Sequence, residues 1–578
     1  MIRRVSPEPD GPSELDQMLV FVSEQDLGLP ETTLPQLEDI VAGLPFEAAM
    51  LNVAVLQARI EPVLTDAAGQ RAVASDFYAN RNDLLARFDA VLRNDPGRTI
   101  FSPQPLTLLM RVLIERGTHT ARKALTPREF ERLQDAVLGA HSAIETALDA
   151  LPLPTPEAKL AYEIQAATIF RRPPLLEEMS RQGELMRLAT TDERLTSSKN
   201  RVPVDEWLAA SGLDRHRQWA LGFGLASITN SFGDQVTPLA LGARVTGLLE
   251  ALGMSEVSPD LPVIASSRKE FQERFAALSG GPEAMGWEVR PFKTTPFLRL
   301  ANGDLLLLAT PWMLSWVGEG FHYRTMSEAQ RSAGGAASAR YTRFIGEVVE
   351  RYALDLAESA IQPPVRALGE QRYGRHGGQL TSDLAIVSNT DLVLFEINAR
   401  RVAATAAVTG TVADATLEIS RLLVEKADQV GGCISALLSG EATLPDVDMS
   451  TVKRIWPVVV SVGHVMQTSN LWSFLRASLD PEKAASFGDS RVQPLQIMDI
   501  GDYEKVMALA EAGHPVAEML GLKTAGPYRD RDFAAWLHAD PAAPSDEARL
   551  SVLKERWDAM GEEIAHRAAQ AEGVDAGD

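Results

Sequence analysis

The hydrophobic pattern of this chain changes its period once, near Trp287, and this change limits the fold more than any other feature of the sequence. Before it, apolar residues recur at helical spacing, as in residues 130–151 and 157–170. After it, short apolar runs alternate with helical stretches. The pattern therefore predicts a mixed α+β and α/β protein. Because the chain has 578 residues, it needs more than one core, at about 100–200 residues per domain.

The first part, residues 1–280, is predicted to be a helical region of one domain or two. Thr126-Pro127 is typical of a helix start, with proline in the first turn. Ser267 and Glu270 have the spacing of a capping box ahead of a helix at residues 271–278. This region contains no repeat of fixed period and no catalytic motif. Its helical surfaces are where we expect a second copy of the chain or a protein partner to bind.

A small β-rich connector is predicted at residues 281–335. Asn302-Gly303 favours a type I′ hairpin between two of its strands. Small residues at 332–338 indicate a linker. The expected strands are residues 287–292, 297–300 and 304–309, and a short apolar segment follows at 311–317.

A compact α/β domain with a mixed central sheet is predicted at residues 336–490. Its first helix spans 341–360, and Asn389-Thr390 joins its first two strands. The run 392–395 suggests a strand buried on both faces. The remaining C-terminal part, 491–578, is expected to add one strand and helices. In order, the predicted elements are strands 380–388 and 391–402, helix 416–430, strand 455–463, helix 471–479, strand 494–498 and helix 546–570.

Charge and cysteine content exclude several classes of protein. The net charge of −22 argues against a surface that attracts nucleic acid everywhere, although residues 321–401 carry ten arginines and nine acids. One cysteine, Cys433, excludes a disulfide framework and a multi-cysteine metal site. The first sixteen residues lack the apolar core of a secretory signal. We therefore expect a cytoplasmic protein without a membrane span.

Two carboxylates stand out in the predicted hairpin. Asp383 lies in its first strand and Glu396 in its second, and pairing across the turn brings them together among apolar neighbours. Two carboxylates in a low-dielectric setting repel, so one takes up a proton unless a cation joins them. Magnesium, or manganese, suits such hard oxygen ligands, with water and phosphate completing the shell.

The hairpin resembles the PD-(D/E)XK, or restriction-endonuclease-like, nuclease superfamily. Asp383 followed by Glu396-Ile397-Asn398 matches the family's Asp, then Asp or Glu, one residue, then Lys. Residues 345–352 resemble its glutamate-bearing first helix, 426–429 resemble its Lys/Gln helix, and 456–460 lie where its next strand is expected. The region 287–536 is also similar to uncharacterised bacterial proteins that carry such a module.

The resemblance implies magnesium-dependent hydrolysis of a phosphodiester in DNA and, by analogy, a role in restriction or antiphage defence. Asp383, Glu396 and the carbonyl of Ile397 would hold the metal, assisted by Glu347 or Glu350. The sequence departs from the family at Asn398, where lysine is usual. Lys426, the only lysine between Lys293 and Lys453, is the first substitute for it, and Arg400 is the second. Replacing Asn398 with lysine should then raise cleavage.

Two other interpretations remain open. The chain could be an inactive nuclease-fold protein that binds nucleic acid or a partner, with Asn398 marking lost chemistry. It could also be a helical interaction protein in which Asp383 is a strand-edge charge and Glu396 pairs with an arginine. If nucleic acid binds, we expect five arginines to line one cleft: Arg343, Arg372, Arg375, Arg400 and Arg401.

Overall fold

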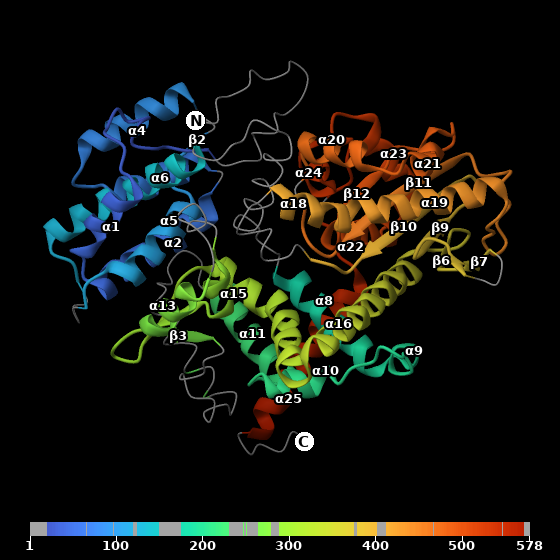
Figure 1. The fold of residues 1–578 in the computed structure, drawn as a ribbon, viewed down its shortest axis with the longest axis horizontal. Coiled ribbons are helices and arrows are strands. Elements are labelled where there is room, and N and C mark those ends of the chain that lie inside the picture. Colours follow the sequence, from blue (N-terminus) through green and yellow to red (C-terminus); the bar gives the residue numbers. More distant parts are fainter. Residues whose placement is uncertain are drawn as a thin grey trace.

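The protein is a mixed α/β molecule in which helices predominate, and this confirms the coarse fold class (Figure 1). Within the part of the chain that is described, no helix is both long and apolar enough to cross a membrane. The computed structural model describes residues 20–64, 66–95, 98–119, 124–149, 175–230, 247, 250, 264–278, 288–374, 378–401, 412–465, 467–545 and 547–571. The helix expected at 157–170 lies outside these residues.

The N-terminal unit is a helical layer closed by one short parallel pair of strands. Leu37, Val41 and Leu133 are fully buried, because α1 packs lengthwise against α6. This unit is coloured blue in Figure 1. Its elements are β1 Val20–Phe21, α1 Leu34–Ala42, α2 Phe46–Ile60, η2 Glu61–Val63, α3 Ala67–Phe77, α4 Asn82–Asn94, β2 Arg98–Thr99, α5 Pro103–Arg116 and α6 Pro127–Asp149.

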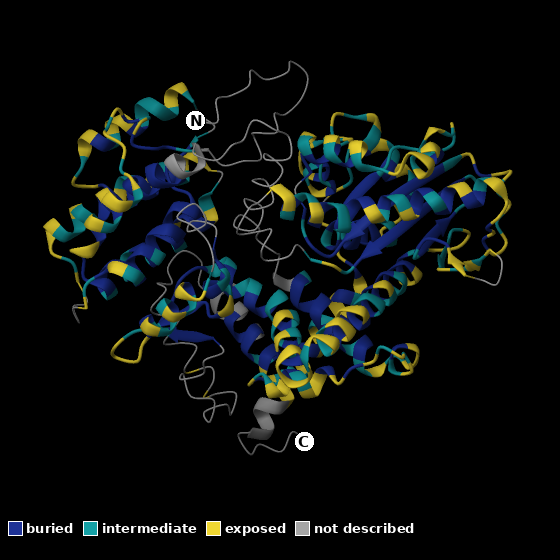
Figure 2. Cartoon of the chain, in the orientation of Figure 1, coloured by how far each residue is buried: buried dark blue, intermediate teal, exposed yellow. Residues whose placement is uncertain are grey.

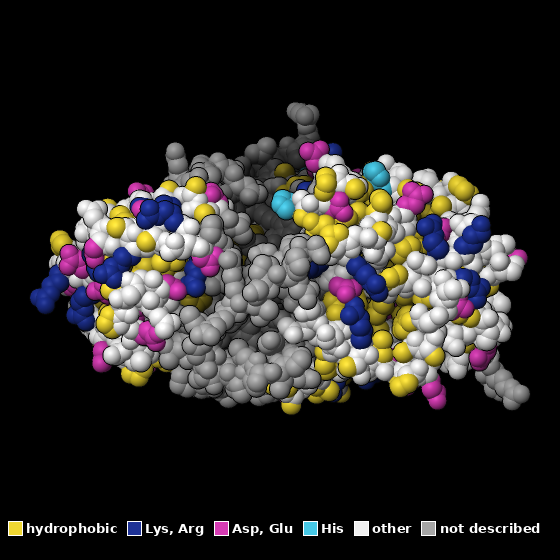
Figure 3. Space-filling model, turned by 90° about the horizontal axis from the view of Figure 1, so that it is seen from above, with side chains coloured by type: hydrophobic (Ala, Val, Ile, Leu, Met, Phe, Trp, Pro, Cys, Tyr) yellow, Lys and Arg dark blue, Asp and Glu magenta, His cyan; other side chains and the backbone are white. Residues whose placement is uncertain are grey.

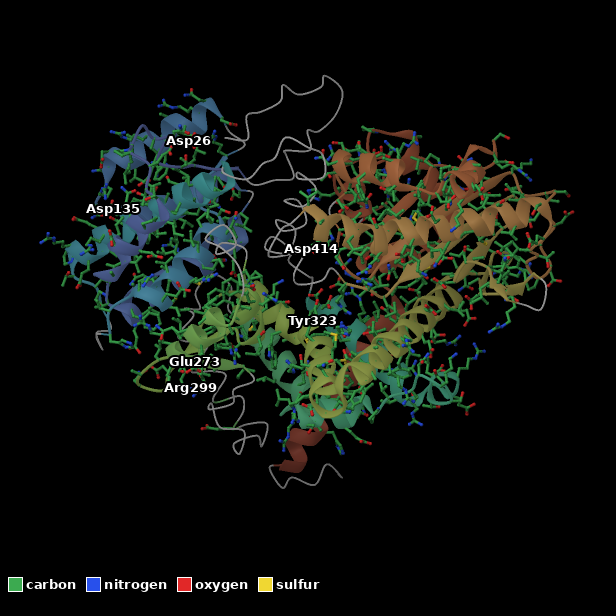
Figure 4. All side chains as sticks on the ribbon, in the orientation of Figure 1. Asp26, Asp135, Glu273, Arg299, Tyr323 and Asp414 are labelled. Carbon is green, nitrogen blue, oxygen red and sulfur yellow. The ribbon has the colours of Figure 1, made fainter. Side chains whose placement is uncertain are left out.

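A three-stranded sheet separates this unit from the rest of the molecule. Its strands, β3 Ala265–Ser267, β4 Phe297–Arg299 and β5 Leu305–Leu307, pair in that order. Leu298 and Leu306 pack into the N-terminal core, whereas Phe297 and Leu305 face the larger core, so the sheet is buried on both sides. Figure 4 labels Arg299 of β4 and Glu273 of α13 (Arg268–Ala276) in this region.

The connector differs from the prediction in two ways. Residues 290–294 form helix α14 (Arg290–Thr294), not a strand, because Pro291 starts a helical turn. The hairpin turn is not type I′, since that turn needs positive φ at both central residues. Asp446 is the one non-glycine with positive φ in the described chain, so Asn302 does not qualify. Instead, the Gly303 amide donates to the Leu300 carbonyl at 2.9 Å, and Gly303 has φ 86°.

The central helices connect the two halves of the molecule. The longest, α16 (Glu319–Ala360), includes the residues predicted as a linker, with a break only at Gly334, where φ is 74°. Small residues are compatible with a helix, and only glycine takes this positive φ without strain. The other helices of this region are α8 Leu175–Thr191, α9 Glu193–Thr196, α10 Val204–Ala210, α11 Arg215–Asn230, α15 Thr310–Val317 and α25 Ser551–Ala571.

The α/β part is built on a five-stranded mixed sheet. The strand order is β12-β11-β10-β9-β6, with β10, β11 and β12 parallel and β9 antiparallel to both of its neighbours. The edge strand β6 was not predicted from the sequence, and β12 extends the sheet past residue 490. The strands are β6 Arg366–Gly369, β9 Leu384–Val387, β10 Asp391–Asn398, β11 Arg454–Ser461 and β12 Gln496–Asp499, and a separate pair is β7 Arg372–Tyr373 with β8 Gln379–Leu380.

Helices cover both faces of this sheet, which explains why its central strands are buried throughout (Figure 2). Val393 and Phe395 face the core shared with α16, while Leu392 and Leu394 face α19. The helices after β10 are α18 Val412–Ile419, the π-helical η6 Ser420–Val424 and α19 Glu425–Ser439. Later come α20 Ser469–Ser478, α21 Pro481–Ala484, η7 Ala485–Gly488, α22 Ile500–Glu511, α23 Val516–Ala525 and α24 Phe533–Ala539.

Candidate functional site

Three acidic residues lie in a row across the sheet: one directly after β6, one directly before β9 and one within β10. Leu384 of β9 pairs with Gly369 of β6 on one side and with Phe395 of β10 on the other. The next positions in these registers are Glu370, Asp383 and Glu396. Because neighbouring strands lie roughly 4.8 Å apart, the three carboxylates occupy adjacent positions on the sheet.

Lys426 of α19 joins the two central carboxylates. Its Nζ donates to Glu396 Oε2 at 3.0 Å and lies 3.6 Å from Asp383 Oδ2. The Asp383 and Glu396 side chains are only 11% and 6% exposed, and Lys426 is 19% exposed, so this contact is shielded from water. Asp383 Oδ2 also accepts from the Ile397 amide at 2.7 Å. This side-chain bond ties the residue directly before β9 to strand β10. Asp383 therefore stabilises the sheet in addition to any role in binding a ligand.

The cluster carries more negative charge than Lys426 can neutralise. Burial, reinforced by the charge of Asp383, raises the pKa of Glu396 well above its ordinary value. Burial and Asp383 also raise the pKa of Glu370, and they raise the pKa of Glu350, on α16, to about 8. Glu350 is nevertheless exposed, so water screens part of the charge of its neighbours.

The neighbouring carboxylates stabilise the positive charge of Lys426. Burial acts to lower the pKa of Lys426, but the carboxylates of Asp383 and Glu396 outweigh it and raise that pKa. Lys426 is therefore a fixed cation at neutral pH.

Asn398 faces a helix and not the carboxylate pair. Its amide nitrogen donates to the carbonyls of Arg421 and Leu422, at 3.0 and 2.9 Å, inside the π-helical stretch η6. A π-turn leaves carbonyl groups without the usual helical partner, and π-turns occur often at functional sites. Asn398 thus fixes the helix that carries Lys426 on its next turn.

Two other candidate residues are directed elsewhere. Glu347 does not contact the carboxylate pair: its Oε1 accepts from Asn200 Nδ2 at 2.6 Å, and its Oε2 accepts from Ser198 Oγ. Arg400 binds Glu418 Oε1 at 3.0 Å, so it does not pair with Glu396.

The five arginines do not share one environment. Arg401 lies near His322 and Tyr341, Arg343 is exposed on α16, and Arg372 is exposed on β7. Arg400, as above, pairs with Glu418, and Arg375 lies outside the described residues. The single cleft expected for these arginines stays a prediction, because Arg375 lies outside the described residues and Arg400 is engaged by Glu418.

The residues present fit a single hard cation bound through two carboxylates. In the described chain, no three His, Cys, Asp or Glu side chains are grouped so that they could hold a metal ion. Asp383 and Glu396 nevertheless both reach one ammonium nitrogen, so their oxygens can converge on one small cation. Mg²⁺ commonly binds one or two carboxylates and keeps several waters.

Glu370 is the site residue that the sequence analysis missed. It follows β6, whose sequence Arg-Ala-Leu-Gly shows no alternation of apolar and polar residues. A strand here would have been recognisable only from its position between the first helix and the hairpin.

Comparison with known proteins adds no family to this description. No family model matches the chain, and no match was found among the curated proteins or the solved structures.

Proposed function

We propose that the α/β part of this protein is a restriction-endonuclease-like domain that hydrolyses phosphodiester bonds in DNA with a divalent metal ion. The contact of Lys426 Nζ with both Glu396 and Asp383 carries the proposal, because it supplies the two carboxylates and the lysine of that chemistry at one point. The sheet order, with a hairpin followed by a helix and a parallel strand, supports it further.

Each residue has a distinct role in this proposal. Asp383 and Glu396 would hold Mg²⁺ or Mn²⁺, which activates water and neutralises charge on the phosphate when bound. Lys426, which replaces the lysine missing at Asn398, places a fixed positive charge beside the scissile phosphate. Glu350 and Glu370 keep the surroundings negative and so favour a cation. In the reaction, a water oxygen bonds to phosphorus, the bond from phosphorus to the leaving oxygen breaks, and the water proton passes to the leaving oxygen or to solvent.

Calorimetry with Mg²⁺ and Mn²⁺, followed by a DNA cleavage assay, tests the proposal. The wild-type protein should bind one ion and cut DNA, while Glu396→Gln and Asp383→Asn should lose both properties. Glu425→Gln is the matched control, since it removes an exposed carboxylate beside Lys426. Unchanged metal binding in Glu396→Gln would rule out this metal site.

A second candidate is an inactive nuclease-fold protein that binds nucleic acid or a protein partner. One observation favours it: the amide of Asn398 is committed to the carbonyls of η6, so this position supplies no charge to a phosphate. DNA binding without cleavage by the wild-type protein, in Mg²⁺ and in Mn²⁺, would support this candidate over the first.

A further inference from the structure

A loop from the helical half of the chain is attached to α16 beside the candidate site. It comprises residues 197–203 and connects α9 with α10, which lie next to α16 in Figure 1. Ser198 and Asn200 donate to the carboxylate of Glu347, and Asn200 is held in turn by a 3.0 Å bond from its amide to Ser198 Oγ. Arg340 adds a third attachment, because its Nη2 donates to the Lys199 carbonyl at 3.1 Å. The loop is therefore fixed on one face of the helix.

That face of α16 runs directly to the candidate site. Arg340, Arg343, Glu347 and Glu350 are spaced by three, four and three residues, which places them on one stripe of the helix. Glu350, at the end of the stripe, is close enough to Asp383 for that charge to raise its pKa. At a rise of 1.5 Å per residue, Arg343 lies about 10 Å along the helix from Glu350.

Four exposed cations gather where the loop meets this stripe: Lys199, Arg201, Arg340 and Arg343. In the described structure, the Lys199 and Arg343 side chains make no hydrogen bond or ion pair, so their charges are available. Glu347, the acid between them and the site, is occupied by Ser198 and Asn200. On the face drawn in Figure 3, by contrast, basic and acidic side chains are interspersed. In a chain of net charge −22, these four cations are a local source of attraction for a phosphate backbone.

We propose that Lys199, Arg201, Arg340 and Arg343 form a track that binds the phosphate backbone of a nucleic-acid strand leading to Asp383 and Glu396. This inference rests on the proposed function and names the surface that delivers its substrate. One strand of a duplex carries one phosphate per ~3.4 Å of duplex axis, so a duplex lying parallel to α16 would pass Arg343 about three nucleotides before the site. The stripe leads into a site proposed for phosphodiesters, and this favours nucleic acid over an acidic protein as the ligand.

The test measures DNA binding without cleavage, by fluorescence anisotropy of labelled oligonucleotides in EDTA over a range of salt concentrations. The variant Lys199→Ala/Arg343→Ala removes two charges without breaking a hydrogen bond. The control Lys269→Ala/Lys554→Ala removes two exposed charges on α13 and α25. Each lost phosphate contact should weaken binding about tenfold at ~0.1 M salt and flatten the salt slope by about one unit, whereas the control should match the wild type.

The outcomes separate the track from the proposed hydrolysis. If the variant and the control bind alike, or if wild-type protein does not bind DNA at low salt, the track is wrong. Binding of polyglutamate but not DNA would assign the surface to an acidic protein and overturn the inference as well. If the variant loses DNA affinity and no protein cleaves in Mg²⁺ or Mn²⁺, the track stands and the hydrolysis fails.

Discussion

At the scale of single residues, we expect Lys426 to have two opposing effects on the candidate site. Its ammonium group contacts both Asp383 and Glu396, and so it occupies the point at which a divalent ion would bind. The same charge would stabilise a phosphate brought to that point. A residue that competes with the metal and assists the reaction should show both effects when it is removed.

We therefore expect Lys426→Met to bind Mg²⁺ more tightly than the wild type and to cleave DNA about 100- to 1000-fold more slowly, the usual cost of losing one preorganised donor. Calorimetry and initial cleavage rates measure the two effects. Lys453→Met, which changes an exposed lysine ahead of β11, should leave both values unchanged. Near-normal cleavage by Lys426→Met would remove Lys426 from the mechanism and direct attention to Arg400.

Glu350 gives the protein a predictable dependence on pH. Its pKa rises from 4.5 to about 8 on folding, so between these values the folded chain keeps a proton that the unfolded chain loses. This contribution to stability is complete below pH 4.5 and is lost as the pH rises towards 8. Urea denaturation of Glu350→Gln should show a weaker decline over this interval than the wild type. An unchanged decline would mean that Glu350 ionises normally.

Metal affinity should increase as the pH rises, whereas the contribution of Glu350 to stability decreases. Because a bound cation displaces protons from Glu396 and Glu350, we expect Mn²⁺ affinity to increase from pH 6 to pH 8, by up to about tenfold per pH unit for each proton released. Calorimetry in buffers of different ionisation enthalpy counts those protons. An affinity that does not vary with pH would contradict a protonated cluster.

At the scale of elements, the strand β10 and the helix that follows it are joined by Asn398. Lysine at this position was expected to restore the family pattern and raise cleavage. The structure argues against that expectation, because the side chain at 398 faces the Arg421 and Leu422 carbonyls, and Lys426 already supplies an ammonium group to the carboxylates.

We now expect Asn398→Lys not to increase cleavage. Asn398→Leu should lower the free energy of unfolding by about 1–3 kcal/mol, because it leaves two carbonyls of η6 without their donor. It should also slow cleavage, because α19 would no longer be held to the strand. Urea denaturation and cleavage rates measure these effects. Faster cleavage by Asn398→Lys would show that the lysine of the family pattern can act from the strand.

At the scale of the whole molecule, a buried polar network attaches the α/β part to the helical half. Arg181 of α8 donates to Glu504 of α22 through Nη2 at 2.8 Å, and Tyr352 of α16 donates to the same carboxylate at 2.6 Å. Arg181 and Glu504 are each 5% exposed. The two contacts join residues 323 and 152 positions apart and link α8, α22 and α16 through one carboxylate, so the placement of α16, which carries Glu350, depends on α8 as well as on α22.

Arg181→Met should lower the free energy of unfolding by about 3–5 kcal/mol, because it leaves Glu504 buried without its cation. Arg187→Ala, on the same helix, removes an arginine that is 39% exposed. Its buried partner Glu184 keeps Arg556 at 2.8 Å, so the change should cost less than ~1 kcal/mol. Denaturant unfolding of the two variants compares these values. Equal stability of Arg181→Met and the wild type would show that the network does not hold the two halves together.

The sequence by itself determined most helices of the chain and the hairpin that carries Asp383 and Glu396, because period and turn residues act over a few neighbouring positions. Lys426 was named from the family resemblance of residues 426–429 and as the only lysine between Lys293 and Lys453. Only the tertiary structure decided which side chains meet. Glu370 joins the row of acidic residues because it follows the edge strand β6, whose residues show no alternation of apolar and polar side chains. Glu347 instead binds Ser198 and Asn200, about 150 positions away. Such contacts depend on how distant elements pack against each other, and the pattern of neighbouring residues does not predict that packing.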